Sequence, residues 1–278
     1  MDKGKIKMPA DKHILLVDDY EVNQIVAKRH LESVGYKVDV AVDGSKAIEA
    51  FERGNYDLIL MDIEMPVMDG WESTRTIRNL ESATASCKDK RVPIIAMSGH
   101  VMEDDTAGYQ QAGMDDSMAK PIERAILLEL VQKWLQEPSA EESEVTHSNR
   151  PLSAESLNEE DARPIDLDKA IEEFMGDGDA VRQLLHDFVR TGSEQITTIE
   201  QAMSSADYEK IRLEAHALRG GAANLTAFPL AESCAGMEEA AGRPAPDQLT
   251  PLLASLKKEF NRLTAYVDQT ENASGSAE

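Results

Sequence analysis

The sequence lacks the features that direct a chain to a membrane or to an oxidising compartment. No apolar run approaches the ~18 residues that a membrane-spanning helix needs, and no apolar stretch follows Lys3, Lys5 and Lys7 to complete a signal peptide. Cysteine is scarce, because Cys87 and Cys234 are the only two in 278 residues, and they lie too far apart for metal-ligand spacing. Such cysteines are typical of reduced thiols. We therefore expect a cytoplasmic protein without membrane insertion.

Basic residues are also in short supply. The 29 Lys and Arg residues face 52 Asp and Glu residues, so the formal net charge is −23. A chain this acidic is repelled by nucleic-acid phosphates and by anionic membrane surfaces, which argues against either as its main partner. With 278 residues, 41% of them hydrophobic, the chain is long enough to fold as about two globular domains.

The first predicted domain covers residues 11–136, where short apolar runs alternate with helical patterns. The predicted strands are His13–Val17, Lys37–Ala41, Leu58–Met61, Pro93–Met97 and Asp116–Ala119. The predicted helices are Glu21–Val34, Gly44–Arg53, Trp71–Asn79, Val101–Ala112 and Glu123–Gln136. This alternation predicts an α/β doubly wound fold with a five-stranded parallel sheet. In such sheets the ligand site lies beyond the carboxyl ends of the strands.

Polar side chains follow four of these strands. Asp18 and Asp19 come after the first, Asp62 after the third, Ser98 after the fourth and Lys120 after the fifth. Each could be an ordinary cap or turn residue by itself, but together they would bring three carboxylates, a hydroxyl and an ammonium to one edge. Clustered carboxylates need a cation between them, and oxygen ligands favour Mg²⁺. This set suits phosphoryl transfer to a carboxylate, with metal and ammonium neutralising the phosphoryl charge.

The same domain resembles the receiver domain of bacterial response regulators, most closely the receivers attached to hybrid sensor kinases. The motifs that carry the resemblance are Val17-Asp18-Asp19, Met61-Asp62, Met65-Pro66-Val67-Met68-Asp69-Gly70 and Lys120-Pro121-Ile122. The family pattern implies a cis peptide bond before Pro121. One position departs from that pattern, because Ser117 stands where receivers usually carry Tyr or Phe. The resemblance therefore implies the phosphorylation chemistry, with a weaker aromatic output switch.

The resemblance also assigns roles to the residues at the strand ends. Asp62 would be the phosphoacceptor. The ligands of Mg²⁺ would be Asp19, Asp62 and the backbone carbonyl of Glu64 directly, and Asp18 through water. Ser98 and Lys120 would bind the phosphoryl oxygens.

The remainder of the chain divides into a linker and a helical domain. Residues 137–164 are acidic, contain Ser and Pro, and have almost no aromatic residues, which is typical of a flexible linker. Residues 165–271 show helical periodicity with short connections, and these predict an all-α antiparallel helix bundle. Asp179 and Asp207 are the predicted N-caps of two of its helices.

A histidine stands out in the helix that begins at Asp207. The predicted core stripe of this helix is Ile211, Ala215, Leu218, Ala222 and Leu225. His216 lies one residue off the stripe, next to Arg219, so we expect both side chains to face solvent. Gly220 and Gly221 each cost about 1 kcal/mol relative to Ala inside a helix, and their small size would let a partner surface reach the imidazole. By position alone, an ordinary surface histidine is an equally good interpretation.

The segment from His216 to Leu225 resembles the histidine phosphotransfer (Hpt) domain, whose usual pattern is His-x-Leu-Lys-Gly followed by small residues. Arg219 replaces the commoner Lys and keeps a cation near the phosphoryl group. The resemblance implies that His216 accepts and donates phosphate, assisted by Arg219.

The two resemblances together predict a two-component phosphorelay intermediate. Asp62 would accept phosphate from the phosphohistidine of a sensor histidine kinase, and His216 would carry phosphate to or from a receiver aspartate. The expected partners are that kinase and another receiver or phosphotransfer protein, with no nucleic acid. We expect a phosphotransfer protein rather than a multiple-turnover enzyme, since the remaining residues leave no room for a kinase domain. Two alternatives are a Mg²⁺-dependent aspartyl-phosphate phosphatase and a signalling scaffold that only binds.

Overall fold

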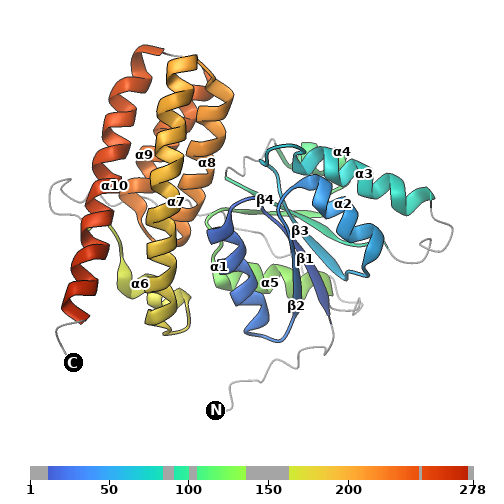
Figure 1. The fold of residues 1–278 in the computed structure, drawn as a ribbon. Helices are drawn as coiled ribbons and strands as arrows, with labels where there is room; N and C mark the ends of the chain where they lie inside the picture. Colours follow the sequence, from blue (N-terminus) through green and yellow to red (C-terminus); the bar gives the residue numbers. More distant parts are fainter. Residues whose placement is uncertain (1–11, 84–90, 100–104, 136–162, 244–245, 275–278) are drawn as a thin grey trace.

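The computed structural model describes residues 12–83, 91–99, 105–135, 163–243 and 246–274. An N-terminal α/β domain and a C-terminal helical domain lie side by side, as Figure 1 shows. Within the described residues, no helix has the length and apolar character needed to cross a membrane.

The α/β domain contains a five-stranded parallel sheet in the order β2-β1-β3-β4-β5. Its strands are β1 (His13–Val17), β2 (Lys37–Ala41), β3 (Leu58–Asp62), β4 (Ile94–Ser98) and β5 (Asp116–Ala119). The predicted doubly wound sheet is confirmed. Strands β3 and β4 each end one residue later than predicted, so Asp62 and Ser98 are the last residues of their strands.

Helices cover both faces of this sheet. They are α1 (Glu21–Glu32), α2 (Gly44–Arg53), α3 (Gly70–Ala83), α4 (Asp105–Ala112) and α5 (Arg124–Leu135). Ala27 of α1 and Val131 of α5 pack on one face with Leu16. Helices α2, α3 and α4 cover the opposite face, where Ile77 of α3 packs in the same core as Leu15. Alternate residues of β1 thus enter two separate cores, as the pleat of a strand requires. The first residues of the predicted helix Val101–Ala112 lie outside the described residues.

The C-terminal domain is a helix bundle. Its helices are α6 (Leu167–Glu173), α7 (Gly178–Ser205), α8 (Tyr208–Asn224), α9 (Phe228–Gly242) and α10 (Pro246–Ser274), and the four long ones lie side by side in Figure 1. Asp207 caps α8 as predicted, because its side chain accepts a hydrogen bond from the Lys210 amide. The predicted cap of α7 is wrong. Asp177 accepts from the Ala180 amide, and Asp179 lies in the first turn.

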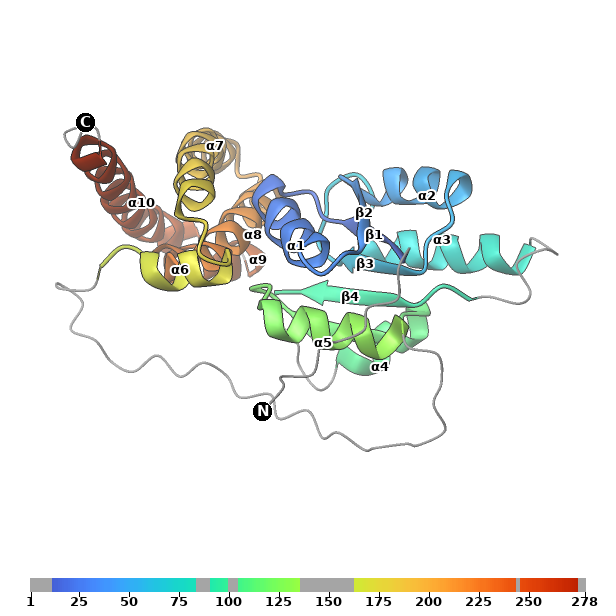
Figure 2. The same ribbon diagram turned by 90° about the horizontal axis from the view of Figure 1, so that it is seen from below.

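Helix α1 belongs to both domains. Its Val22 and Val26, with the preceding Tyr20, join the hydrophobic core of the bundle rather than that of the sheet. Figure 2 shows α1 next to α7 and α8. A Cβ at Gly221 of α8 would collide with the Tyr20 ring and come within 2.9 Å of Phe188. The glycine therefore permits the close approach of the two domains. Most of the predicted linker lies outside the described residues, and the predicted domain boundaries stay predictions.

Candidate functional site

The three predicted acidic residues meet at the carboxyl end of the sheet. Asp18 and Asp62 are buried and Asp19 is half-buried, and their ligand oxygens all lie within 4.8 Å of one another. Lys120 reaches into this cluster, with its Nζ 2.7 Å from Asp62 Oδ2 and 2.9 Å from Asp18 Oδ2. The structure therefore brings together four of the residues that the sequence singled out.

The carboxylates carry more negative charge than Lys120 balances. Burial raises the pKa of Asp62 to about 6, while Lys120 opposes the shift. Burial, followed by the charges of Asp62 and Asp18, raises the pKa of Asp19 to about 7. A hard divalent cation bound by oxygen ligands would relieve this repulsion, so the donor set fits Mg²⁺.

The other receiver residues border the acidic cluster. Ser98 ends β4 and is 8% exposed, and its backbone carbonyl accepts a hydrogen bond from the Lys120 amide at 2.7 Å. The peptide bond between Lys120 and Pro121 is cis, which confirms that expectation. The Glu64 amide lies 3.3 Å from Asp62 Oδ1.

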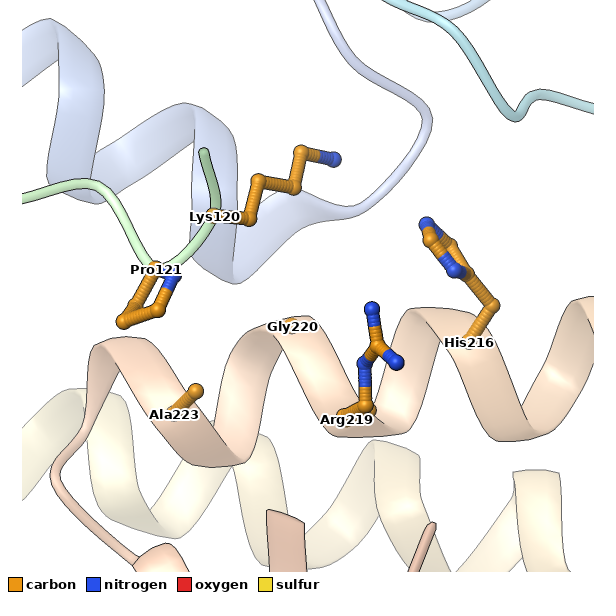
Figure 3. A pocket seen from close by; sticks show the side chains of 6 residues that line it. All are labelled: Lys120, Pro121, His216, Arg219, Gly220 and Ala223. Atoms are coloured by element: carbon orange, nitrogen blue, oxygen red, sulfur yellow. The ribbon is translucent and has the colours of Figure 1, made fainter. Parts of the chain in front are cut away.

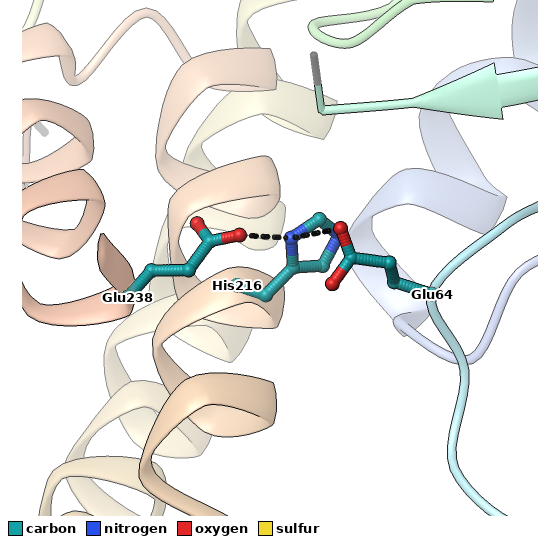
Figure 4. A group of neighbouring side chains, drawn as sticks. All are labelled: Glu64, His216 and Glu238. Atoms are coloured by element: carbon teal, nitrogen blue, oxygen red, sulfur yellow. Dashed lines mark hydrogen bonds and ion pairs between the residues drawn. The ribbon is translucent and has the colours of Figure 1, made fainter. Parts of the chain in front are cut away.

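His216 lies in the interface between the domains and is only 5% exposed. Its Nδ1 is 2.8 Å from Glu238 Oε1 and 3.8 Å from Glu64 Oε1, as Figure 4 shows. Burial disfavours the charged ring, but the hydrogen bond to Glu238 and the charge of Glu64 outweigh it and raise the pKa of His216. The expectation of a solvent-exposed imidazole is wrong, because the receiver covers it.

Arg219 also differs from expectation. Its side chain is 13% exposed, and Nη1 lies 3.0 Å from Glu238 Oε2. A small pocket between the domains is lined by Lys120, Pro121, His216, Arg219, Gly220 and Ala223. In Figure 3, Lys120 extends from the receiver above α8, and His216 and Arg219 extend from α8 into the same space. Receiver and bundle residues thus share one site.

Sequence reasoning assigned no role to the side chains of Glu64 and Glu238. Glu64 also forms an ion pair with Arg212 of α8, so it links the two domains beside His216. Glu238 lies 22 residues from His216 and on another helix. Periodicity within a single helix could not connect them.

Two family models match this chain. The model of the response regulator receiver domain matches residues 14–132, and the model of the Hpt domain matches residues 183–273. The chain therefore contains a response regulator receiver domain followed by an Hpt domain.

Similar proteins include long bacterial sensors. The aerobic respiration control sensor protein ArcB of Escherichia coli is 31% identical over 224 residues, covering 81% of this chain and 27% of ArcB. The sensor histidine kinase GacS of Pseudomonas protegens is 28% identical over 262 residues, covering 94% of this chain and 26% of GacS. The chain thus spans about a quarter of the length of these relatives.

Among solved structures, the receiver domain of the sensor histidine kinase PA1611 from Pseudomonas aeruginosa is 42% identical. Its crystal structure is described with a magnesium ion coordinated in the active site cleft. The match covers 45% of this chain and 98% of that one, with a TM-score of 0.40.

Proposed function

We propose that this protein is a two-component phosphorelay intermediate in which Asp62 and His216 exchange a phosphoryl group within one chain. The observation that carries the proposal is the position of His216, which lies buried in the pocket that Lys120 also lines. A histidine that acted only on other molecules would not need its own receiver's ammonium beside it. Holding donor and acceptor together removes most of the entropic cost of a bimolecular transfer.

The receiver residues would prepare Asp62 for the reaction. Asp18, Asp19, Asp62 and the Glu64 carbonyl would hold Mg²⁺, which supplies charge neutralisation on the phosphoryl oxygens when bound. Lys120 Nζ already contacts Asp62 Oδ2 at 2.7 Å. Once Asp62 is phosphorylated, this ammonium would bind an oxygen of the phosphoryl group. Ser98 would donate a hydrogen bond to another phosphoryl oxygen.

His216 would act as the nucleophile through Nε2. When the neutral ring donates its Nδ1 proton to Glu238, the lone pair is on Nε2. Nε2 then forms the bond to phosphorus as the bond from phosphorus to the Asp62 oxygen breaks, and the carboxylate leaves with the electron pair. Glu238 stabilises the positive charge that develops on the ring. Arg219, held by Glu238, would contribute a cation to the phosphoryl oxygens.

Phosphate labelling of the intact chain tests this function. With Mg²⁺ and labelled acetyl phosphate, alkali-labile label on Asp62 should appear first and acid-labile label on His216 second. The rate of the second step should not change with protein concentration, because the transfer is intramolecular. Steady release of phosphate from small phosphomonoesters would instead favour the phosphatase, and absence of any label would favour the scaffold.

The partners follow from the same chemistry. Receiver and Hpt domains imply partners among histidine kinases and other relay proteins, and the relatives include proteins named as sensor kinases. We propose that a sensor kinase phosphohistidine loads Asp62 and that His216 passes phosphate to a further receiver. Such an exchange would take place in the cytoplasm.

Mg²⁺ should stabilise the folded protein more at pH 8 than at pH 5. Asp19 and Asp62 release their protons at a higher pH in the folded protein than in the unfolded chain. Between about pH 4 and pH 7 the unfolded chain therefore binds fewer protons, so stability without metal falls as the pH rises. Saturating Mg²⁺ adds roughly 3 kcal/mol at a hundredfold excess over Kd, or about 5 °C or more in Tm. Thermal melts with and without Mg²⁺ check this.

Asp19→Asn is the control for the effect of Mg²⁺ on Tm. The amide cannot ionise, so this variant should show both a flatter pH dependence and a smaller response to the metal. An equal Mg²⁺ response of the unaltered protein at both pH values would contradict the prediction.

The transfer from Asp62 to His216 should slow as the pH falls. Only the neutral ring has a lone pair on Nε2, and the pKa of His216 is raised above 6.5 by Glu238 and Glu64 despite burial. The midpoint of the pH–rate profile should therefore lie above pH 6.5. Glu238→Gln removes the largest influence that raises the pKa of His216. The midpoint of this variant's profile should therefore move to lower pH, and its maximal rate should fall about tenfold or more. Single-turnover transfer measured between pH 5.5 and 9 gives both values.

Glu239→Gln is the matched control for Glu238→Gln. Glu239 is the next residue on α9 and is exposed, and its side chain forms an ion pair with Arg243. Its profile should match that of the unaltered protein. A Glu238→Gln profile with an unchanged midpoint would show that Glu238 does not set the charge state of His216.

A further inference from the structure

Two buried asparagines connect the domains beside the acidic cluster. Asn23 of α1 is 2% exposed, and Asn224 at the end of α8 is 6% exposed. Asn224 Nδ2 donates to Asn23 Oδ1 at 2.8 Å. Neither residue resembles a catalytic group, and neither was singled out by its sequence context.

The asparagine pair is part of a longer hydrogen-bonded chain. The Ile122 amide donates to Asn224 Oδ1 at 2.7 Å. Asn23 Nδ2 donates to the Asp18 carboxylate, at 3.1 Å from Oδ1 and 3.3 Å from Oδ2. This chain of hydrogen bonds begins at Ile122, two residues after Lys120, and ends on Asp18, a predicted metal-binding carboxylate. It therefore joins two parts of the phosphoryl site through a residue of the other domain.

The ends of this chain fix the orientation of both amides. A backbone amide can only donate and an ionised carboxylate can only accept. Asn224 must therefore turn its oxygen toward Ile122, and Asn23 must turn its nitrogen toward Asp18. All donors then point the same way along the chain, which strengthens each hydrogen bond in a buried setting. Only side chains with both a donor and an acceptor can occupy the two middle positions.

A glycine allows this chain to form. A Cβ at Gly220 would lie 3.2 Å from Asn23 Nδ2, closer than side chains normally approach. Gly220 is four residues before Asn224 and four after His216, so the three lie along one side of α8. Gly220 thus leaves the space through which Asn23 reaches Asn224.

We propose that Asn23 and Asn224 are the recognition pair that positions the Hpt domain on a receiver. A receiver that docks on α8 would need an amide side chain at the position of Asn23. Without that amide, Asn224 Nδ2 would be buried without an acceptor. Such a loss typically lowers an equilibrium or a rate by about 10- to 100-fold. The selected partner class is therefore receivers with an amide at this position. The consequence for transfer rests on the proposed function, whereas the pairing itself does not.

Asparagine-to-aspartate substitutions in the full chain test this proposal, because they keep the size of the side chain. Asn224→Asp retains an acceptor for Ile122 but loses the donor to Asn23, and Asn23→Asp loses the donor to Asp18. Each should slow the Asp62-to-His216 transfer by 10-fold or more, expressed per aspartyl phosphate present in the same sample. In a cycle of Asn23→Ala, Asn224→Ala and the double alanine variant, the effects on the transfer rate should not multiply, since the two side chains act as one unit.

A second measurement needs no phosphate. Asn224→Ala removes the acceptor of the Ile122 amide, so hydrogen exchange of that amide, followed by NMR, should accelerate by 10-fold or more. Arg29→Ala is the control, since its ion pair with Asp177 also joins the domains but lies at the exposed rim. Arg29→Ala should change the transfer rate and the Ile122 exchange rate by no more than about threefold.

The outcomes separate the two proposals. Transfer within threefold of the unaltered protein in either aspartate variant, or an unchanged Ile122 exchange rate in Asn224→Ala, would overturn the recognition pair. If the unaltered protein never labels His216, the proposed function fails, and Ile122 exchange alone still decides whether the pair holds the domains together.

Discussion

Asp62→Asn should remove phosphate from both domains when acetyl phosphate is the donor, whereas His216→Gln should remove only the acid-labile label. The Asp62 carboxylate lies against Lys120, whose Nζ is 2.7 Å from Asp62 Oδ2 and 2.9 Å from Asp18 Oδ2. An amide of the same shape has no negatively charged oxygen to attack phosphorus. Because His216 would receive its phosphate from Asp62, the first variant should lose both labels. The expected decrease is to background, which acid and alkali treatment of labelled protein will resolve.

Asp69→Asn is the matched control for this loss. Asp69 lies seven residues after Asp62 and is exposed, and its Oδ1 accepts from the Glu72 amide, which an amide oxygen can also do. Its labelling should equal that of the unaltered chain. Label on His216 in the Asp62→Asn protein would mean that acetyl phosphate reaches the histidine directly. Label on its receiver would show that another residue is the acceptor.

Asp62→Asn should not cost stability. The pKa of Asp62 is raised to about 6 by burial, so the folded protein tolerates the charged form less well than the unfolded chain does. Removing that charge at pH 8 should keep the Tm the same or raise it. Loss of label can therefore be separated from loss of fold.

The sheet and the acidic edge could be predicted from sequence because they depend on local pattern and simple topology. Apolar runs of four or five residues define buried strands, and parallel strands bring their carboxyl ends to the same edge. Asp62, Lys120 and the Asp18–Asp19 pair follow from that rule alone. The errors in strand ends were single residues, because a polar residue that ends a buried strand gives no hydrophobic signal.

The environment of His216 could not be predicted in the same way. The periodicity of α8 distinguishes the face in the bundle core from the remaining surface, but it cannot show that a second domain covers that surface. The double glycine at 220–221 did indicate a close partner. What the pattern could not supply was the identity of that partner, because α1 of the same chain is about two hundred residues away in sequence.

Helix α1 shows why interdomain contacts escape such reasoning. Ala27 and Leu31 pack into the sheet domain, and Val22 and Val26 pack into the bundle. A helix with two apolar faces can be taken for one broad face of a single core. Only the structure separates these two faces. It shows that a substitution at Val26 can disrupt docking of the domains without touching the acidic site.

Val26→Asp should therefore slow the transfer from Asp62 to His216. Val26 is 2% exposed, and its neighbours in the docked state are apolar. A buried carboxylate without a partner costs several kcal/mol, so docking should weaken by more than about 100-fold. Separation of the domains would return the new charge to water. Transfer at micromolar protein should fall at least tenfold and stay independent of protein concentration, because the tether still supplies a millimolar effective concentration and the same charge weakens docking between chains.

Ile25→Asp provides the comparison, since Ile25 is the preceding residue on α1 and is 37% exposed. The same charge there remains in water in the docked state, so the transfer rate should stay within about threefold and independent of concentration. Labelling of Asp62 by acetyl phosphate in each variant checks that the receiver is folded. If Val26→Asp still transfers at the original, concentration-independent rate with Asp62 labelled normally, the α1–α8 contact is not the surface through which His216 reaches Asp62. If instead both variants slow equally, charge on α1 rather than docking controls the reaction.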